Sequence, residues 1–361
     1  MSAYVPADSK VGITALAAHP ERIDVRSPSE FAADHIPAAI NLPVLDDAQR
    51  AEVGTMHTRV SAFAARRHGA ALVARNIADM LATHCADKPR EWSPLVYCWR
   101  GGKRSGSLAH VLKEIGFRAV QLQGGYQTYR RHVVATLATL PLRFDYVVVC
   151  GLTGSGKSRF LRALDDTGAQ VLDLEEMARH RGSLLGDLPD DPQPTQKAFE
   201  SATLAALETF DPARPVFVES ESRKIGSVQL PDALLASMRA ARCVKLVTPQ
   251  ALRVAGLMED YEHFLRDPDA LADKLERLVP LHGRKTIERW NAAASAGEFD
   301  SLVDELLLRH YDPMYARSIE TNFPASTIAL IVTPSSLSHA ALRELARDVM
   351  AKVEHIAEPT L

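Results

Sequence analysis

The chain has 361 residues, of which 46% are hydrophobic, and a formal net charge of -3. This length and apolar content predict two globular domains, each with its own core. The nearly balanced charge excludes a protein whose overall field attracts nucleic acid or membranes, although local basic patches can still bind RNA.

Cysteine spacing and apolar runs narrow the class of protein further. The four cysteines are widely spaced and form no CxxC pair, which argues against a disulfide framework and a structural zinc site. The first ten residues, MSAYVPADSK, contain no apolar core of signal-peptide length, and no apolar run reaches the roughly 18–20 residues of a membrane span. We therefore expect a soluble, cytoplasmic protein with no membrane partner.

The first part of the chain alternates between strand and helix patterns. Ser27 and Pro28 form a helix start, with Glu30 three residues after the capping serine. Strands are expected at residues 22–26, 94–98 and 119–122, and helices at residues 46–86, at residues 103–116 and after Gly124-Gly125. This alternation predicts a parallel sheet covered by helices on both faces.

A single thiol lies between an expected strand and an expected helix. Cys98 follows the apolar strand, and Gly101 and Gly102 allow backbone amides to turn inward around an anion. With nearby positive charge, this position should lower the pKa of Cys98 and favour its nucleophilic thiolate. The predicted catalytic residues are Cys98 and Arg104, and the predicted anion-binding residues are Arg100, Gly101, Gly102, Lys103 and Ser105.

The thiol loop has the spacing C-x5-R, because Arg104 follows Cys98 by six residues. Cysteine phosphatases share this spacing and use the arginine to hold phosphate with two hydrogen bonds. Tyr97, however, occupies the position of the phosphatase histidine. A loop of this width indicates room for an anion such as a phosphorylated chalcogen donor.

The pattern of a parallel α/β domain begins again near Pro141. We place the boundary at residues 136–144, with domains at 1–138 and 139–361. Further strands are expected at residues 146–150, 171–174, 216–219, 243–247 and 328–332, with helices between them, and a mobile loop at residues 182–194. The predicted fold class is α/β, with two successive parallel-sheet domains.

A complete phosphate-binding loop, GLTGSGKS, follows the strand at residues 146–150. Its amides should cradle phosphate oxygens, Lys157 should neutralise them, and the Ser158 hydroxyl could bind Mg²⁺. Glu219 and Glu221, at the end of a later strand, are candidates for an acid or for holding a metal-bound water. No tightly bound cofactor is expected. The predicted phosphate-binding residues are Gly151, Thr153, Gly154, Ser155, Gly156, Lys157 and Ser158.

The first domain resembles the rhodanese family. The resemblance rests on IDVRSPSEF, HIPAAINLP, the strand-Cys-loop-helix around Cys98 and LQGGYQTYRR, and covers residues of about 15–135. Rhodaneses carry sulfur as a persulfide on the loop cysteine. The resemblance thus implies that Cys98 carries or delivers a chalcogen.

The order of the two loops, CWRGGKRS and then GLTGSGKS, resembles the bacterial tRNA 2-selenouridine synthase family over nearly the whole chain. Further matching segments are His180-Arg181-Gly182-Ser183 with Gly186, residues 219–226 (ESESRKIG), and His282-Gly283-Arg284-Lys285. The resemblance implies a P-loop NTPase-like second domain and a transferase. It also implies that wobble 2-thiouridine is geranylated on sulfur by geranyl diphosphate, and that selenium from selenophosphate then displaces the S-geranyl group.

The implied partners are tRNA with a thiolated wobble uridine, geranyl diphosphate, and selenophosphate made by a selenophosphate synthetase. Lys157 and its loop would hold the diphosphate. Cys98 would deliver selenium as a perselenide or its equivalent, while Arg104 and the loop amides hold its phosphate. Candidate tRNA-binding residues form three clusters: Arg130 and Arg131 with His132, Arg284 and Lys285 with Arg289, and Arg66, Arg67 and His68.

Three other functions are consistent with parts of the sequence. A C-x5-R cysteine phosphatase would use Cys98 and need no RNA, and a P-loop kinase carrying a rhodanese sulfurtransferase domain would turn over ATP through Lys157. A non-catalytic RNA-binding module would leave two intact reactive loops unexplained. The sequence leaves open which tRNAs are used, whether sulfur or selenium is preferred, and the oligomeric state.

Overall fold

The computed structural model describes residues 10–183, 185–188 and 190–357. The chain divides into two compact units, one of Met1–Thr136 with Pro194–Ala205 and one of Leu137–Gln193 with Ala206–Leu361. The first unit therefore includes a segment that lies much later in the sequence. The two units are described separately below.

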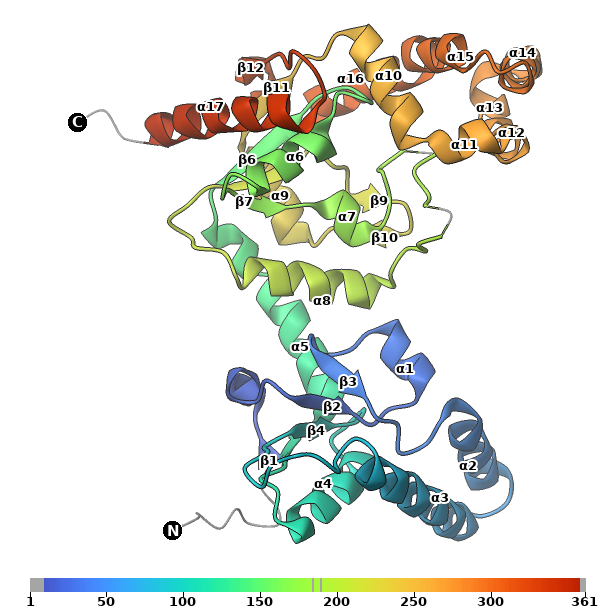
Figure 1. Cartoon of the computed structure of the whole chain (residues 1–361), viewed down its shortest axis with the longest axis vertical. Coiled ribbons are helices and arrows are strands. Elements are labelled where there is room, and N and C mark those ends of the chain that lie inside the picture. Colours follow the sequence, from blue (N-terminus) through green and yellow to red (C-terminus); the bar gives the residue numbers. More distant parts are fainter. Residues whose placement is uncertain (1–9, 184, 189, 358–361) are drawn as a thin grey trace. The chain divides into compact units, whose positions relative to one another are not determined.

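The first unit is built on a parallel sheet with strand order β1-β5-β4-β2-β3 (Figure 1). Its strands are β1 (Lys10–Val11), β2 (Arg22–Asp24), β3 (Ala39–Asn41), β4 (Leu95–Tyr97) and β5 (Val120–Leu122). All three residues of β4 are buried, as are those of β5. This confirms the predicted parallel sheet, although the strands at 22–26 and 94–98 are shorter than expected.

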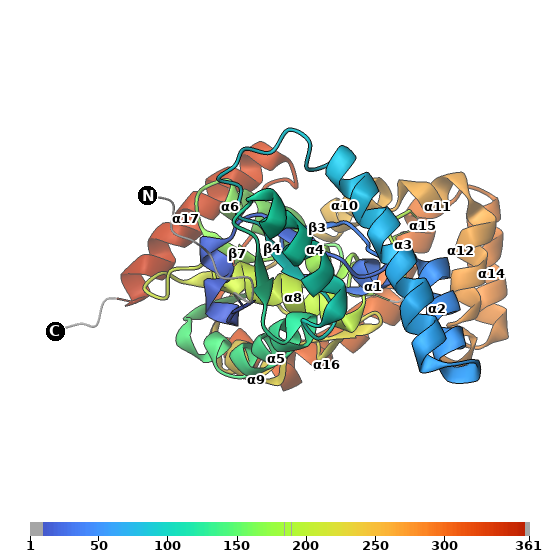
Figure 2. The ribbon, with the colours of Figure 1, turned by 90° about the horizontal axis from the view of Figure 1, so that it is seen from below.

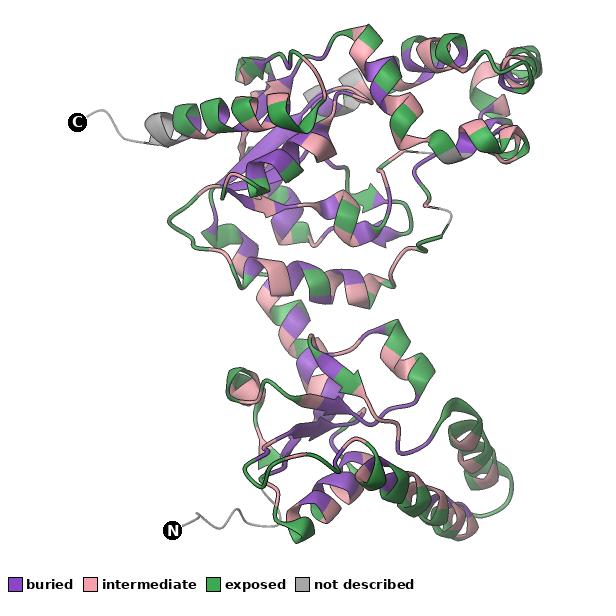
Figure 3. Cartoon of the chain, in the orientation of Figure 1, coloured by how far each residue is buried: buried purple, intermediate pink, exposed green. Residues whose placement is uncertain are grey.

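The helices of the first unit are η1 (Ile13–Ala18), α1 (Pro28–Ala33), α2 (Asp47–Arg59), α3 (Ala62–Ala82), α4 (Lys103–Ile115) and α5 (Gly125–Leu137). The stretch expected as helical over 46–86 is two helices, because Ser61 caps a new helix through its side chain. Helix α2 packs against α3, and α4 packs against β4 and β5 (Figure 2). Figure 3 shows that the buried residues concentrate in the sheet.

The second unit contains a parallel sheet with strand order β12-β11-β6-β8-β7. Its strands are β6 (Tyr146–Cys150), β7 (Gln170–Leu172), β8 (Val216–Glu219), β11 (Arg242–Leu246) and β12 (Leu330–Val332). Every residue of the central strand β6 is buried, as expected for a continuous apolar run. The expected strand over 171–174 ends early because Asp173 caps helix α7 (Leu174–Ala178).

Helices and one hairpin complete this sheet layer. They are η2 (Leu140–Arg143), α6 (Lys157–Asp165), β9 (Lys224–Ile225) paired antiparallel with β10 (Val228–Gln229), α9 (Asp232–Ala240) and α17 (His339–Ala357). Helix α8 (Gln196–Leu207) belongs to the first unit as far as Ala205. Helix α17 packs against α6. Residues 324–328, part of which was expected as strand, form the short helix η4 (Pro324–Ile328).

Between β11 and β12 the chain forms a helical layer with its own core. Its helices are α10 (Gln250–Asp260), α11 (Glu262–Arg266), α12 (Pro268–Glu276), α13 (Val279–His282), α14 (Arg284–Ser295), α15 (Phe299–Leu306), the π-helical turn η3 (Leu307–Tyr311) and α16 (Asp312–Asn322). Trp290 is fully buried at the centre of this core. Within the part of the chain that the structure describes, no helix has the length and apolar content to cross a membrane.

Two expectations lie partly outside the described residues. The N-terminal segment MSAYVPADSK is described only at Lys10. Of the loop expected over 182–194, residues 184 and 189 lie outside, and Asp187 forms an isolated antiparallel bridge with His180.

Candidate functional site

The thiol of Cys98 is buried at the carboxyl end of β4, with 3% of the residue exposed. Its sulfur accepts a hydrogen bond from the backbone amide of Gly102 at 3.3 Å and another from the hydroxyl of Ser105 at 3.1 Å. Both donors belong to the start of α4, where backbone amides have no partner within the helix. The predicted strand-thiol-helix arrangement is therefore present, with two donors directed at the sulfur.

Gln121, on the neighbouring strand β5, supports the Ser105 hydroxyl. Its side-chain amide nitrogen donates to Ser105 Oγ at 2.8 Å and to the carbonyl of Gly102 at 2.9 Å. Because an amide nitrogen can only donate, Ser105 accepts this bond, and its own proton has two acceptors, Cys98 at 3.1 Å and the Gly102 carbonyl at 3.4 Å. The sequence reasoning missed Gln121, since it lies 23 positions from Cys98 on another strand.

Gly101 holds the thiol loop against the following glycine turn. It has φ of 60°, and a Cβ added there would lie 2.9 Å from the backbone nitrogen of Gly124. A side chain at this position would therefore collide with backbone rather than with a movable side chain. The loop keeps its shape through this backbone-to-backbone packing.

The cations of the loop have different surroundings. Arg100, Lys103 and the backbone of Gly102 are exposed, whereas Arg104 is half-buried. Arg104 Nη1 donates to Glu30 Oε2 at 2.7 Å, and Glu30 also pairs with Arg50 at 3.0 Å. Burial raises the pKa of Glu30, but the hydrogen bond and charge of Arg104 outweigh it and the pKa is lowered overall. Arg104 is thus already engaged by a carboxylate.

The start of α8 contributes a lysine beside the thiol loop. Lys197 Nζ lies 5.7 Å from the centre of the Trp99 ring, within the range of a cation–π interaction. Arg130, a predicted tRNA-binding residue, pairs with Glu200 of the same helix. This ion pair partly neutralises Arg130, while Lys197 is a cation that the sequence reasoning missed.

The phosphate-binding loop connects β6 to α6. Lys157 is buried, its ammonium group donates to the Gly151 carbonyl at 3.0 Å, and it lies 4.7 Å from the centre of the Tyr315 ring. Burial lowers the pKa of Lys157, but Tyr315, Glu175 and Glu221 raise it overall, so the side chain is a cation. Lys157 thus occupies the loop with its charge intact.

Helix α10 supports this loop from one side. Arg253, which is buried, donates through Nε to the Thr153 carbonyl at 2.9 Å and pairs with Asp312 at 2.5 Å. Leu257 lies against Gly154, where an added Cβ would meet Leu257 Cδ1 at 2.8 Å. The loop backbone is therefore positioned by one buried cation and one apolar contact from the helical layer.

A cluster of carboxylates lies on the other side of Lys157 and Ser158. Ser158 Oγ donates to Glu175 Oε2 at 2.7 Å, and the Glu175 amide donates to Glu219 Oε1 at 2.6 Å. Burial and Glu175 raise the pKa of Glu221 to about 8, and burial with Asp173 raises that of Glu219 well above its ordinary value. Glu221 therefore holds a proton near neutral pH.

The donors near Ser158 allow a direct test of the expected Mg²⁺ site. Within the described ranges, no group of three or more His, Cys, Asp or Glu side chains is arranged to hold a metal ion. Mg²⁺ commonly uses only one or two protein oxygens and completes its shell with phosphate and water. The Ser158 hydroxyl and the Glu175 carboxylate fit that smaller donor set.

The phosphate loop opens into a cavity lined by both cations and carboxylates. The cations besides Lys157 are Arg159, Arg162, Arg179 and Arg181, and the carboxylates are Asp173, Glu175, Glu176, Asp191 and Asp260. Arg159 pairs with Asp260, and Arg179 pairs with Asp191. Arg181 also stacks over the Tyr261 ring at 4.6 Å. Arg159 and Arg162 lie three positions apart on α6, directly after the loop, so the sequence alone could have identified them as cations near the phosphate site. Arg181 belongs to the segment His180-Arg181-Gly182-Ser183, which the sequence analysis named as a match to the synthase family.

The remaining predicted tRNA-binding residues are solvent-facing. Arg131 is exposed and donates to the Thr128 hydroxyl at 3.2 Å, within its own helix. Arg284 and Lys285 are exposed at the start of α14. Arg66 and Arg67 are exposed on α3, and Arg289 pairs with Glu305. Their RNA-binding role stays a prediction.

Comparison with known proteins gives a consistent assignment. A family model described as a rhodanese-like domain matches residues 14–132, and one described as the tRNA 2-selenouridine synthase AAA domain matches residues 144–274. The tRNA 2-selenouridine synthase of Nitrosomonas europaea is 35% identical over 265 residues, covering 72% of this chain and 67% of that protein. Those of Shewanella denitrificans and Aeromonas salmonicida are 32% and 33% identical over 327 and 323 residues, each covering 81% of this chain and 86% and 85% of those proteins.

Proposed function

The chain belongs to the tRNA 2-selenouridine synthase family, and on this premise we propose that it converts wobble 2-thiouridine of tRNA to 2-selenouridine through an S-geranyl intermediate. The observation that carries the proposal is the presence of two separate anion loops, one with a buried thiol that accepts two hydrogen bonds and one with a buried, charged lysine. Two loops of different chemistry suit two successive transfers to the same base.

The first stage alkylates the thiouridine sulfur. The sulfur attacks C1 of geranyl diphosphate, the C1–oxygen bond breaks, and diphosphate leaves with the bonding electrons while the ring loses its N3 proton. Lys157 and the amides of the phosphate loop hold the departing diphosphate and stabilise its growing charge. Arg181, in the same cavity, supplies a further cation. When Mg²⁺ is bound, Ser158 and Glu175 hold it, and it adds charge stabilisation.

The second stage replaces sulfur with selenium. A perselenide on Cys98, as expected from the resemblance, would need a two-electron oxidant, so we propose a different role for the thiol. The Cys98 thiolate attacks the phosphorus of selenophosphate, the phosphorus–selenium bond breaks, and selenide leaves with the bonding electrons. Selenide then adds to C2 of the alkylated ring, and the C2–sulfur bond breaks to release geranyl thiol. Water hydrolyses the phosphocysteine. No oxidant is needed, because selenium keeps its oxidation state throughout. The loop amides and Arg104 hold the phosphoryl oxygens.

The tRNA substrate requires positive surface near both loops. Lys197 beside Trp99, Arg131 and the pair Arg284 and Lys285 are the cations proposed to contact the tRNA backbone. Phosphate contacts of this kind release counterions, so binding should weaken as salt concentration rises. The protein needs no tightly bound cofactor for either stage.

Nucleoside mass spectrometry tests the proposal. Thiolated tRNA is incubated with the protein, geranyl diphosphate and selenophosphate, and each donor is omitted in turn. We expect S-geranyl-2-thiouridine with the first donor alone and 2-selenouridine when both are present. Unchanged thiouridine in every reaction, with folded protein and bound tRNA, would refute the proposal and favour the phosphatase or kinase alternatives.

A further inference from the structure

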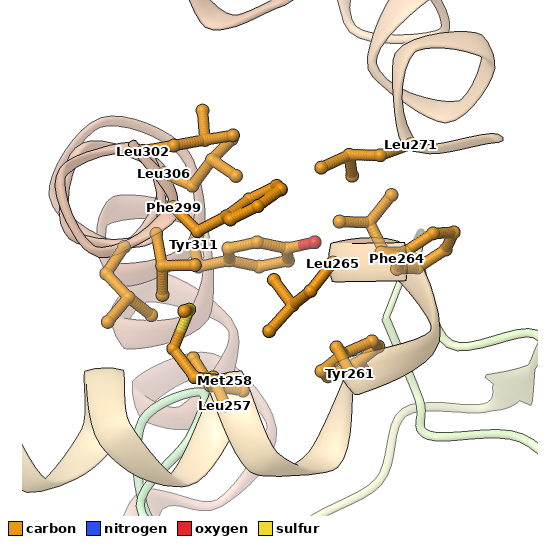
Figure 4. A pocket seen from close by; sticks show the side chains of 13 residues that line it. Leu257, Met258, Tyr261, Phe264, Leu265, Leu271, Phe299, Leu302, Leu306 and Tyr311 are labelled. Atoms are coloured by element: carbon orange, nitrogen blue, oxygen red, sulfur yellow. The ribbon is translucent and has the colours of Figure 1, made fainter. Parts of the chain in front are cut away.

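The helical layer of the second unit contains an apolar cavity beside the phosphate loop. It lies among α10, α11, α12, α15 and η3, and all 13 residues that line it are aliphatic, aromatic or methionine (Figure 4). An apolar cavity of this kind does not hold ordered water, because water needs two to four polar partners. The chemistry of the lining therefore fits a hydrocarbon. The cavity measures about 60 Å³ in this structure, so a chain of ten carbons enters it only if lining side chains move apart.

This apolar cavity adjoins the cavity that contains the phosphate loop and Lys157, the group expected to hold an anion. Leu257 and Tyr261 line both cavities. Leu257 also contacts the phosphate loop at Gly154, and the Tyr261 ring carries the Arg181 guanidinium 4.6 Å from its centre. A ligand that fills both cavities must therefore combine an anionic head with an apolar tail.

The apolar cavity has a near side and a far side relative to the phosphate loop. In Figure 4, Leu257, Met258 and Tyr261 lie on one side, and Phe299, Leu302 and Leu271 lie across the cavity from them. Leu302 and Leu271 are 2% and 6% exposed and belong to the core around Trp290. The far side is therefore a packed wall that limits how long a tail can be.

We propose that this cavity binds the hydrocarbon chain of the alkyl donor and that Phe299 and Leu302 set the chain length it accepts. The inference rests on the proposed function for the identity of the donor, but the cavity, its lining and the two lining residues that it shares with the cavity of the phosphate loop are independent of that function. Each methylene buried in such a site strengthens binding by about fourfold at most. The tail, and not only the diphosphate, then contributes to affinity.

Calorimetric binding of pyrophosphate, dimethylallyl, geranyl and farnesyl diphosphate to the full chain tests the cavity. We expect geranyl diphosphate to bind at least about tenfold more tightly than pyrophosphate, and farnesyl diphosphate to bind no better than geranyl diphosphate. Equal affinity for pyrophosphate and geranyl diphosphate would overturn the proposal without any variant. If farnesyl diphosphate binds more tightly than geranyl diphosphate, Phe299 and Leu302 do not limit the chain length, and that part of the proposal is wrong.

Two substitutions locate the tail. Met258→Trp should fill the near side and lower the affinity for geranyl diphosphate by about tenfold, while the affinity for pyrophosphate stays unchanged. The matched control is Met314→Trp, at a residue on α16 that is 57% exposed. Phe299→Ala should enlarge the far side and shift the preference toward farnesyl diphosphate. Loss of pyrophosphate and geranyl diphosphate affinity together in Met258→Trp would count against the cavity as the tail site.

The outcome separates this inference from the function on which it rests. If the wild-type protein binds geranyl diphosphate through the tail but transfers nothing to thiolated tRNA, the cavity assignment stands and the alkyl-transfer stage is wrong. If it transfers the geranyl group, yet Phe299→Ala leaves the ratio of geranyl to farnesyl transfer unchanged, the function stands and the length-setting wall is refuted.

Discussion

The hydroxyl of Ser105 lies 3.1 Å from the sulfur of Cys98, closer than its other acceptor, the Gly102 carbonyl at 3.4 Å, and it accepts a hydrogen bond from the Gln121 amide at 2.8 Å. Gln121 is thus a positioning residue that acts through Ser105. Two donors, the Gly102 amide and the Ser105 hydroxyl, thus point at the sulfur, and Gln121 on β5 supports the second of them.

Ser105→Ala should slow the alkylation of Cys98 by iodoacetamide at neutral pH by about tenfold, because one of the two donors to the sulfur is lost. Peptide mass spectrometry reads the rate at Cys98 separately from the other cysteines. Ser107→Ala is the control, since that hydroxyl donates to the Lys103 carbonyl on the same helix. Equal rates in wild type and Ser105→Ala would show that the hydrogen bond does not activate the thiol.

Arg104→Ala should reduce selenation by at least about tenfold and leave geranylation unchanged, because the guanidinium belongs to the thiol loop and not to the phosphate loop. Arg104→Lys should not restore the rate, since lysine lacks the planar fork that holds both Glu30 and a phosphoryl group. Nucleoside mass spectrometry measures both stages, with exposed Arg118→Ala as the control. A parallel fall of both stages would instead indicate that the first unit is misfolded.

Lys157→Ala should weaken pyrophosphate binding by at least about tenfold and abolish geranyl transfer, because a buried cation in the phosphate loop is removed. Calorimetry gives the affinity, and Lys352→Ala, at an exposed position on α17, controls for general loss of positive charge. A Lys157→Ala protein that geranylates tRNA at the normal rate would refute the role of this loop in the first stage.

Glu221→Gln should stabilise the protein at alkaline pH. The folded-state pKa of Glu221 is raised to about 8 by burial and by Glu175, so the folded protein binds a proton that the unfolded chain releases above its ordinary pKa of 4.5. Glu221 therefore costs stability progressively as pH rises from about 4.5 to about 8. Glutamine does not ionise, so the substitution removes this cost. The free energy of unfolding of Glu221→Gln should exceed that of wild type by on the order of 1–3 kcal/mol at pH 8.5.

Urea unfolding at pH 5 and pH 8.5 measures this effect for Glu221→Gln. The variant should gain more stability over wild type at pH 8.5 than at pH 5. Glu276→Gln, at an exposed position on α12, provides the matched change of charge. A gain that is the same at both pH values would show that Glu221 is not protonated in the folded state.

Ser201→Ala should destabilise the first unit by about 1 kcal/mol, because the buried carboxylate of Asp34 would lose one of its donors. Ser201 Oγ donates to Asp34 Oδ2 at 3.1 Å, and Tyr126 donates to the same oxygen at 2.6 Å. Thermal unfolding measures the change. Thr58→Ala controls for removal of an exposed hydroxyl in the same unit. An unchanged melting temperature would show that the segment at Pro194–Ala205 does not support this unit.

The sequence by itself determined the features that depend on near neighbours in the chain. The alternation of apolar strands and helices predicted two parallel sheets, and the glycine-rich turns after residues 146–150 and around Cys98 predicted both anion loops. These features were readable because a strand, the turn after it and the start of the next helix are contiguous. The resemblance of the two motifs in this order then indicated the family that the comparisons support.

Only the tertiary structure decided which distant residues complete each loop. Gln121 reaches the thiol from a neighbouring strand, Glu30 engages Arg104 from 74 positions away, and Glu175 meets Ser158 from 17 positions away. The apolar cavity is assembled from helices between β11 and β12 together with Leu185. No local sequence pattern predicts these contacts between distant residues, because they depend on the order of the strands and the packing of the helices. The sequence thus indicated where anions could bind, and the fold decided what surrounds them.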